Sequence, residues 1–134
     1  MKQVASLAGL GNNCIFTGPK TLALKFNQEA DVLLSPRVVG TNTPLKIYEQ
    51  LASGKPLVAT AIWSHSQVLT DGVCFLVEPT PDSIAEGILR ALNDGAEAGR
   101  SASAAMAWYD RDYARPIYEE KIRALLVRVG FLKD

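Results

Sequence analysis

Four short apolar runs along the chain predict β-strands, and segments with a helical period lie between them. The runs cover residues 14–16, 31–35, 56–60 and 73–77. None of them alternates cleanly between polar and apolar positions, which is typical of strands covered on both faces of a parallel sheet. Strands that alternate with helices are connected by right-handed crossovers. The pattern therefore predicts an α/β fold with a parallel sheet of about four strands and flanking helices.

Capping residues indicate where the helices begin and end. We expect Thr43 to cap a helix that has Pro44 in its first position, where a missing N–H costs nothing, and Gly54 to end it. The threonine–proline pair at residues 80–81 repeats this arrangement, and we expect that helix to end at Gly95. These boundaries fit the alternation of strands and helices.

Two further helices are expected near the C-terminus. The Ala/Ser-rich stretch 97–107 is one, and residues 116–129, within the C-terminal segment 113–129, are the other. The second has an apolar face made of Tyr118, Ile122, Leu125 and Val129. Residues 1–10 look like the end of a helix with a glycine exit at Gly9 and Gly11. This abrupt start predicts that residues 1–134 form a single but partial domain.

Composition excludes several classes of protein. The chain has 14 basic and 14 acidic residues, so it carries no electrostatic footprint for nucleic acid. Cys14 and Cys74 lie in apolar runs, and we expect two buried thiols in a reducing compartment rather than a disulfide. With one histidine and no paired cysteines, no Cys/His zinc site is expected. No secretory signal and no membrane-spanning run are visible, so we expect a cytoplasmic protein.

Two polar loops are predicted at one edge of the sheet. Residues 40–45 follow the second strand, and residues 60–67 follow the third. Ligands of parallel sheets bind beyond the carboxyl ends of the strands, so we expect a binding site there. The candidate contacts in the first loop and the helix after it are Thr41, Asn42, Thr43, Leu45, Lys46 and Glu49.

These residue types suit a ligand with an anionic group and hydroxyl groups. Backbone N–H groups at a helix start, here those of Leu45 and Lys46, favour a phosphate. The Lys46 side chain either pairs with that phosphate or extends into water. Glu49 can accept hydrogen bonds from a vicinal diol, or it simply faces solvent. A phosphate beside a diol acceptor suits a nucleotide-sugar.

Further candidates are Arg37 after the second strand and His65, the sole histidine, in the second loop. A lone histidine in a loop is most often a surface or packing residue, so both interpretations of His65 stay open. The GxSxG, GxGxxG and GxxxxGK[ST] motifs are missing, which weighs against Ser/His/Asp catalysis and the usual dinucleotide or NTPase sites. The catalytic residue is therefore left unassigned.

Several segments, in this order, resemble the C-terminal half of the group 1 glycosyltransferases of the GT-B fold. They are Ala30–Arg37, Gly40–Glu49, Ala52–Thr60 and Asp71–Pro79, with Ile15–Gly18 similar to the strand before them. The resemblance implies a Rossmann-like, nucleotide-sugar donor-binding domain from a two-domain transferase. It also implies a nucleoside-diphosphate sugar as the donor substrate, without a cofactor.

The resemblance assigns roles to individual residues. It implies that Glu49 binds the ribose hydroxyls and that the backbone at Leu45 meets the diphosphate. Thr41 stands where the family has a glutamate that contacts the donor sugar, so this carboxylate is missing and the donor sugar or its polar contacts differ. Gln67 matches a position in the second loop that is commonly acidic.

The N-terminal acceptor domain of that family is absent from this sequence. We therefore expect the chain to be inactive alone, with exposed apolar edges that favour self-association or docking to the missing half. We expect no transmembrane segment in this chain, and a peripheral place at the inner membrane face stays open for a full-length parent. Two alternatives stay open: a non-catalytic nucleotide- or partner-binding α/β module, and a sugar-nucleotide epimerase-like enzyme on the same fold.

Overall fold

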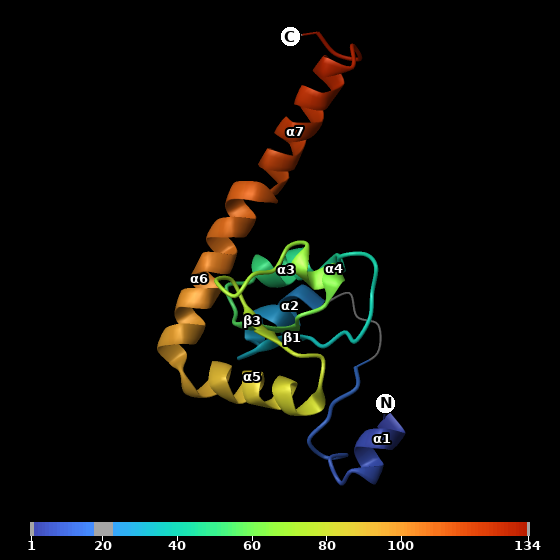
Figure 1. The fold of residues 1–134 in the computed structure, drawn as a ribbon, viewed down its shortest axis with the longest axis vertical. Helices are drawn as coiled ribbons and strands as arrows, with labels where there is room; N and C mark the ends of the chain where they lie inside the picture. Colours follow the sequence, from blue (N-terminus) through green and yellow to red (C-terminus); the bar gives the residue numbers. More distant parts are fainter. Residues whose placement is uncertain (1, 18–22, 134) are drawn as a thin grey trace.

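A computed structural model describes residues 2–17 and 23–133, and Figure 1 shows the arrangement of their elements. Gly18, which ends the first of the family-like segments, lies outside the described residues. The helices are α1 (Lys2–Leu7), α2 (Ala23–Glu29), α3 (Lys46–Leu51), α4 (Trp63–Ser66), α5 (Pro81–Asn93), α6 (Gly95–Asp112) and α7 (Arg115–Arg128), and the strands are β1 (Leu33–Ser35), β2 (Leu57–Thr60) and β3 (Phe75–Val77).

The three strands form one parallel sheet in the order β1-β2-β3, which confirms the predicted α/β class. Leu33 pairs with Leu57 in one register, and Val58 pairs with Phe75 in the other. All four residues of β2 are buried, as expected of a central strand covered on both faces.

The prediction of a strand at residues 14–16 is wrong. These residues have no regular structure, and Ile15 is 90% exposed. A strand is held by hydrogen bonds to a neighbouring strand, and this run pairs with none of the described strands. Cys14 is likewise exposed rather than buried, whereas Cys74 is buried and both thiols are free. Burial, with the charge of Asp71, raises the pKa of the Cys74 thiol to about 12.

Helices cover both faces of the sheet. In Figure 1, α3 and α4 lie on one side of the strands and α5 lies on the other. The inner face of α3 buries Ile47 and Leu51 completely, in one core cluster with Leu57. Gly87 of α5 approaches the other face of the sheet so closely that a Cβ there would lie 2.7 Å from Cγ1 of Val77.

The predicted C-terminal helices are present, with longer or shifted bounds. The helix expected over 97–107 runs from Gly95 to Asp112, because the Asp94 side chain accepts from the Glu97 N–H and begins it early. The last helix, α7, projects away from the sheet and buries none of its residues (Figure 1). Its apolar face is exposed, including Tyr118 at 60% and Leu125 at 51%.

The predicted caps are confirmed at one helix and wrong at another. The Thr80 side chain accepts from the Ser83 N–H at 3.3 Å and caps α5. Thr43 does not cap α3, which begins three residues later at Lys46. The N–H of Ile47 instead donates to the Pro44 carbonyl at 3.0 Å, so the chain enters α3 through a tighter turn. Gly54 follows α3 with a φ of 70°, as predicted for its exit.

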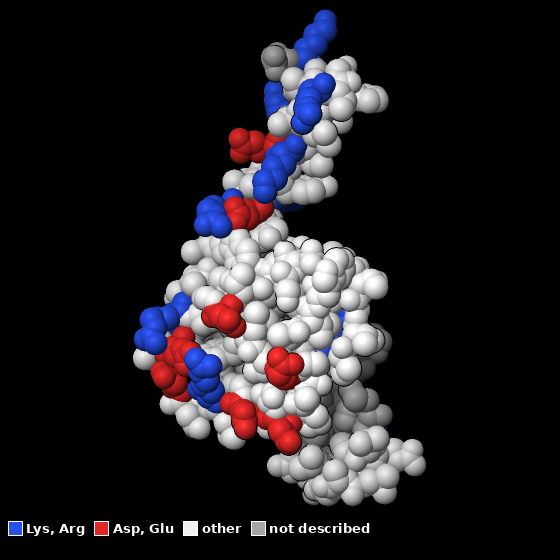
Figure 2. Space-filling model, viewed as in Figure 1, with Lys and Arg blue, Asp and Glu red and all other residues white. Residues whose placement is uncertain are grey.

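Charged side chains are unevenly distributed on the surface. In the view of Figure 2 they gather over α5, α6 and α7, and few lie over α3 and α4. Among the described residues, no helix has the length and apolarity that a membrane crossing requires.

Candidate functional site

The two polar loops meet at the carboxyl edge of the sheet, as predicted. The hydroxyl of Thr43, in the loop after β1, donates to the backbone carbonyl of Ser64 in α4 at 3.0 Å. Gly40 lies in the same place, because a Cβ on it would be 3.0 Å from the Ser64 hydroxyl oxygen. The two loops therefore form one connected surface.

His65 lies beneath this surface and is completely buried. Its Nδ1 is 2.7 Å from the backbone carbonyl oxygen of Thr60, which can only accept, so Nδ1 carries the proton. Its Nε2 then accepts from the hydroxyl of Ser35 at 3.2 Å. The imidazole is therefore neutral and has no free nitrogen for a ligand, and its part in the site is to hold β1, β2 and α4 together.

Electrostatics favour the same neutral form. Burial lowers the pKa of His65, the hydrogen bond with the Thr60 carbonyl opposes this, and the charges of Arg37 and Lys46 lower it further. The Thr60 hydroxyl completes the network by donating to the carbonyl of Arg37. The polar groups at the ends of the two strands are thus satisfied internally.

Arg37 is half-buried and reaches across Gly40, where a Cβ would lie 2.7 Å from the guanidinium carbon. Its Nη1 donates to the backbone carbonyl of Asn42 at 3.1 Å, which fixes the side chain over the first loop. A residue larger than glycine at position 40 would displace the guanidinium. The structure thus places Arg37 within the candidate site.

Lys46 is the first residue of α3, and its ammonium group is repelled by the charge of Arg37. Desolvation lowers the pKa of Lys46, and the repulsion from Arg37 lowers it further. Neither cation has a carboxylate partner within the described parts of the chain. The N–H groups of Leu45 and Lys46 also donate to no group there. The edge therefore presents two cationic side chains and two free backbone donors.

Glu49 is exposed on α3, three residues after Lys46. Residues three apart share one helix face, and the face of Ile47 and Leu51 is buried, so Lys46 and Glu49 point outward together. Glu49 lines a hollow of about 340 Å³ between α2, α3 and α6. The other residues of the hollow are Leu24, Asn27, Gln28, Ala52, Ser53 and Tyr109.

The remaining predicted contacts differ in how free they are. Thr41 and Asn42 are exposed, and the Thr43 hydroxyl is occupied by the Ser64 carbonyl. Gln67 is exposed, and its amide donates to the carbonyl of Trp63 in the preceding turn at 3.3 Å. The hydrogen bond of the Gln67 side chain is therefore with the turn before it and not with another candidate residue.

Sequence reasoning missed α4 and the buried hydroxyl groups around His65. The residues of this helix are mostly polar, and such a pattern predicts a loop. Ser35 and Thr60 end apolar runs and give no sign that their hydroxyls bind a histidine. The pattern of apolar residues along the chain does not show which polar side chains pair with one another in the core.

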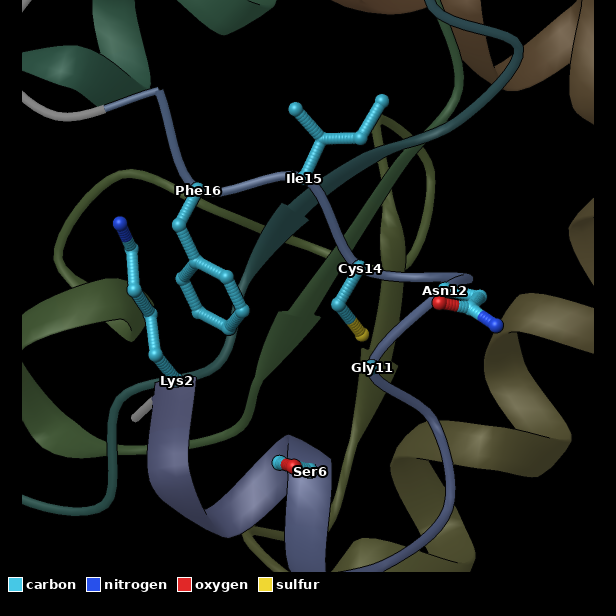
Figure 3. Close-up of a pocket in the computed structure, with 7 residues that line it drawn as sticks. All are labelled: Lys2, Ser6, Gly11, Asn12, Cys14, Ile15 and Phe16. Atoms are coloured by element: carbon cyan, nitrogen blue, oxygen red, sulfur yellow. The ribbon is translucent and has the colours of Figure 1, made fainter.

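A second hollow, of about 540 Å³, lies between α1 and the segment that follows it (Figure 3). Its lining comes from the N-terminal segment alone and includes Lys2, Ser6, Asn12, Cys14 and Phe16. None of the predicted site residues lines it. Within residues 2–17 and 23–133, no group of three or more His, Cys, Asp or Glu side chains is placed to hold a metal ion.

Comparisons with known proteins agree with this geometry. A sequence model of the family described as "Glycosyl transferases group 1" matches residues 1–94. No curated protein gives a significant match. Among solved structures, HepE of Anabaena, crystallised with UDP, superposes with a TM-score of 0.87 at 22% identity over 94% of this chain and 35% of its own.

Two other solved structures have the same fold. Sucrose-phosphate synthase of Thermosynechococcus elongatus gives a TM-score of 0.83 at 21% identity, over 96% of this chain and 33% of its own. The C-terminal domain of the group 1 glycosyl transferase LpcC of Francisella tularensis gives 0.72 at 20% identity, over 85% and 60%. The chain thus spans about a third of the length of the first two proteins.

Proposed function

Because the chain belongs to the group 1 glycosyl transferases, we propose that its carboxyl edge binds the diphosphate of a nucleoside-diphosphate sugar for glycosyl transfer. The observation that carries this proposal is the pair of unpaired cations, Arg37 and Lys46, beside free backbone N–H groups. The charge of Arg37 lowers the pKa of Lys46, and a doubly charged anion bound by both cations relieves this repulsion. HepE, which has the same fold, was crystallised with UDP and with UDP-glucose.

The same groups explain how transfer is promoted. Negative charge grows on the diphosphate as its bond to the sugar breaks. Arg37 is already held by the Asn42 carbonyl, and the loops are fixed from beneath by His65, so the donors need little reorganisation. Preorganised donors aimed at developing charge lower the barrier to bond cleavage. No side chain of this chain is assigned as a catalytic acid or base.

Glu49 suits the ribose of the nucleotide. It lies one turn along α3 from the cationic end, a rise of about 4.5 Å for three residues. It is exposed, and it opens into a hollow whose volume of about 340 Å³ is within the range of ligand pockets. The nucleoside therefore extends from the diphosphate toward α2, and the sugar lies at the opposite end, near Thr41.

Thr41 favours one second candidate, a nucleotide-binding module without transferase activity. The family's glutamate is replaced there by an exposed hydroxyl, and the neighbouring Asn42 carbonyl is occupied by Arg37. Such a module would bind the nucleotide but transfer no sugar. Product formation by a longer form of the protein distinguishes the two functions.

The rest of a two-domain enzyme is proposed as the partner of this chain. HepE and the sucrose-phosphate synthase are about three times as long as this chain, and α7 presents an uncovered apolar face. We propose that the face made by Tyr118, Ile122, Leu125 and Val129 packs against the acceptor domain, or against a second copy when that domain is absent. The isolated chain is expected to be inactive, and robust sugar transfer by it would contradict this.

A calorimetric titration tests the function. UDP is titrated into the wild type, into Glu49→Ala, and into Glu86→Ala, which removes an exposed carboxylate from α5 as the matched control. We expect weak binding by the wild type and a loss of about 10-fold or more in Glu49→Ala, since a hydrogen bond to a charged group contributes ~1.5–3 kcal/mol. The control should equal the wild type. Equal UDP affinities for all three proteins would mean that Glu49 does not contact the nucleotide.

A further inference from the structure

Trp63 is an exposed tryptophan on a rigid support. It is the first residue of α4, and 65% of it is exposed to solvent. The next two residues, Ser64 and His65, are completely buried. The indole therefore stands in water at the point where the chain enters the core.

The backbone around Trp63 is held from several directions. The N–H groups of His65 and Ser66 both donate to the carbonyl of Ile62, at 3.0 Å each. The Ser64 carbonyl accepts from Thr43, and the imidazole of His65 binds the ends of β1 and β2. Such support fixes the backbone that carries the indole, so less conformational entropy is lost when the ring packs on a ligand, as with the aromatic anchors of binding sites.

The position of Trp63 relates it to the diphosphate end of the site. Ser64, the next residue, has its hydroxyl oxygen beside Gly40, and the Arg37 guanidinium lies on the same glycine. That hydroxyl is buried and has no hydrogen-bond partner among the described residues. Glu49, the proposed ribose contact, lines the hollow between α2, α3 and α6, and Trp63 is not part of that lining. Trp63 thus directly precedes, in the chain, a residue that lies at the diphosphate end.

We propose that Trp63 is a stacking platform for the pyranose ring that lies next to the diphosphate. The inference rests on the proposed function, because it requires a sugar at this edge. The C–H groups of a pyranose face are weakly positive and pack on the negative face of an aromatic ring. Such packing needs no carboxylate, which fits an edge where the family's glutamate is replaced by Thr41. The ring comes either from the donor or from the acceptor.

Three titrations test the platform: UDP, UDP-glucose, and glucose added to protein saturated with UDP. Each is made with the wild type, Trp63→Ala and Trp63→Phe. We expect UDP to bind all three proteins equally within about twofold. We expect Trp63→Ala to lose about 5- to 30-fold in one sugar titration, and Trp63→Phe to recover most of that loss. Loss for UDP-glucose assigns the ring to the donor, and loss for glucose assigns it to the acceptor.

The titrations distinguish a failure of the Trp63 platform from a failure of the proposed nucleotide binding. If the wild type binds no UDP, the proposed function fails and the platform fails with it. If UDP binds but neither sugar titration responds to Trp63→Ala, the platform is overturned and the function stands. Trp63→Phe keeps an aromatic ring at the same position, so it also controls for unfolding of α4. A matched Trp108→Phe variant, in the half-buried tryptophan of α6, should change none of the three affinities.

Discussion

The hydroxyl of Ser35, the last residue of β1, lies 3.2 Å from Nε2 of His65, although the two residues are 30 positions apart in the chain. The other ring nitrogen lies 2.7 Å from the carbonyl of Thr60, the last residue of β2. One buried imidazole therefore joins the carboxyl ends of two strands to α4. The loop that carries Arg37 follows the end of β1, and α4, which begins at Trp63, follows the end of β2.

Removing this imidazole should destabilise the fold. We expect His65→Ala to lower the free energy of unfolding by about 2–4 kcal/mol, because it leaves a cavity and an unpaired Ser35 hydroxyl, whereas the Thr60 carbonyl keeps the hydrogen bond from the Ile62 N–H. Urea unfolding followed by circular dichroism measures the change. The control, Gln67→Ala, alters an exposed side chain two residues away and should stay within about 0.5 kcal/mol of the wild type. A similarly small effect of His65→Ala would mean that the hydrogen bonds of the imidazole do not stabilise the fold.

Stability should fall as the solution is made mildly acidic. Burial lowers the pKa of His65 in the folded chain below the ordinary value of 6.5, so between these two pKa values only the unfolded chain binds the proton. The contribution of neutral His65 to the free energy of unfolding is present above pH 6.5. It is lost as the pH falls toward the pKa that His65 has in the folded chain. Since His65 is the sole histidine, the urea midpoint of His65→Gln should change less than that of the wild type between about pH 7.5 and 5.5. Parallel curves would contradict this.

Two glycine-to-alanine changes should have opposite effects on stability. A Cβ at Gly87 would lie 2.7 Å from Val77 and 3.0 Å from Val58, so Gly87→Ala must push α5 off the sheet and cost about 1–3 kcal/mol. Gly99 in α6 has no atom within 4 Å of such a Cβ, and Gly99→Ala should stabilise by about 0.5–1 kcal/mol through helix propensity. Thermal unfolding of the two variants checks the sign. Stabilisation by both would contradict the close packing of α5.

A methyl group at position 40 should weaken anion binding without unfolding the chain. The added carbon of Gly40→Ala would lie 2.7 Å from the Arg37 guanidinium, which must move and release the Asn42 carbonyl. We expect the affinity for UDP to fall about 10-fold, the equivalent of one charge-assisted hydrogen bond. Calorimetry of this variant beside Gly99→Ala makes the comparison. Unchanged UDP affinity in Gly40→Ala would mean that the displaced arginine does not touch the ligand.

Much of the fold could be predicted from local patterns. Continuous apolar runs identified β1, β2 and β3, and the Thr80–Pro81 pair identified the start of α5. The run at residues 14–16 has the same apolar character but no pairing strand, and pairing is a property of the whole sheet rather than of the run. The same limit applies to Thr43, whose hydroxyl bonds across to Ser64 instead of capping its own helix.

The candidate site was predictable in its position but only partly in its chemistry. Parallel topology placed the two polar loops at one edge, and the structure joins them there. His65 was expected in a loop, yet it is the buried centre of the edge, because burial of a polar ring depends on partners distant in sequence. Arg37 lies over the first loop, since Gly40 leaves space for its guanidinium, and its contact with a ligand stays a prediction.

Arg37 and Lys46 are proposed to bind a diphosphate at the carboxyl edge of the sheet. The most direct test of this proposal is calorimetric titration of UDP into the wild type, Arg37→Gln and Lys46→Gln, at low and at high salt. Lys55→Gln, which changes a lysine just before β2 at the opposite edge of the sheet, is the matched control. We predict that each site variant loses about 10- to 100-fold in affinity and depends less on salt, and that the control matches the wild type. Equal UDP affinity in all four proteins would mean that neither Arg37 nor Lys46 binds the diphosphate.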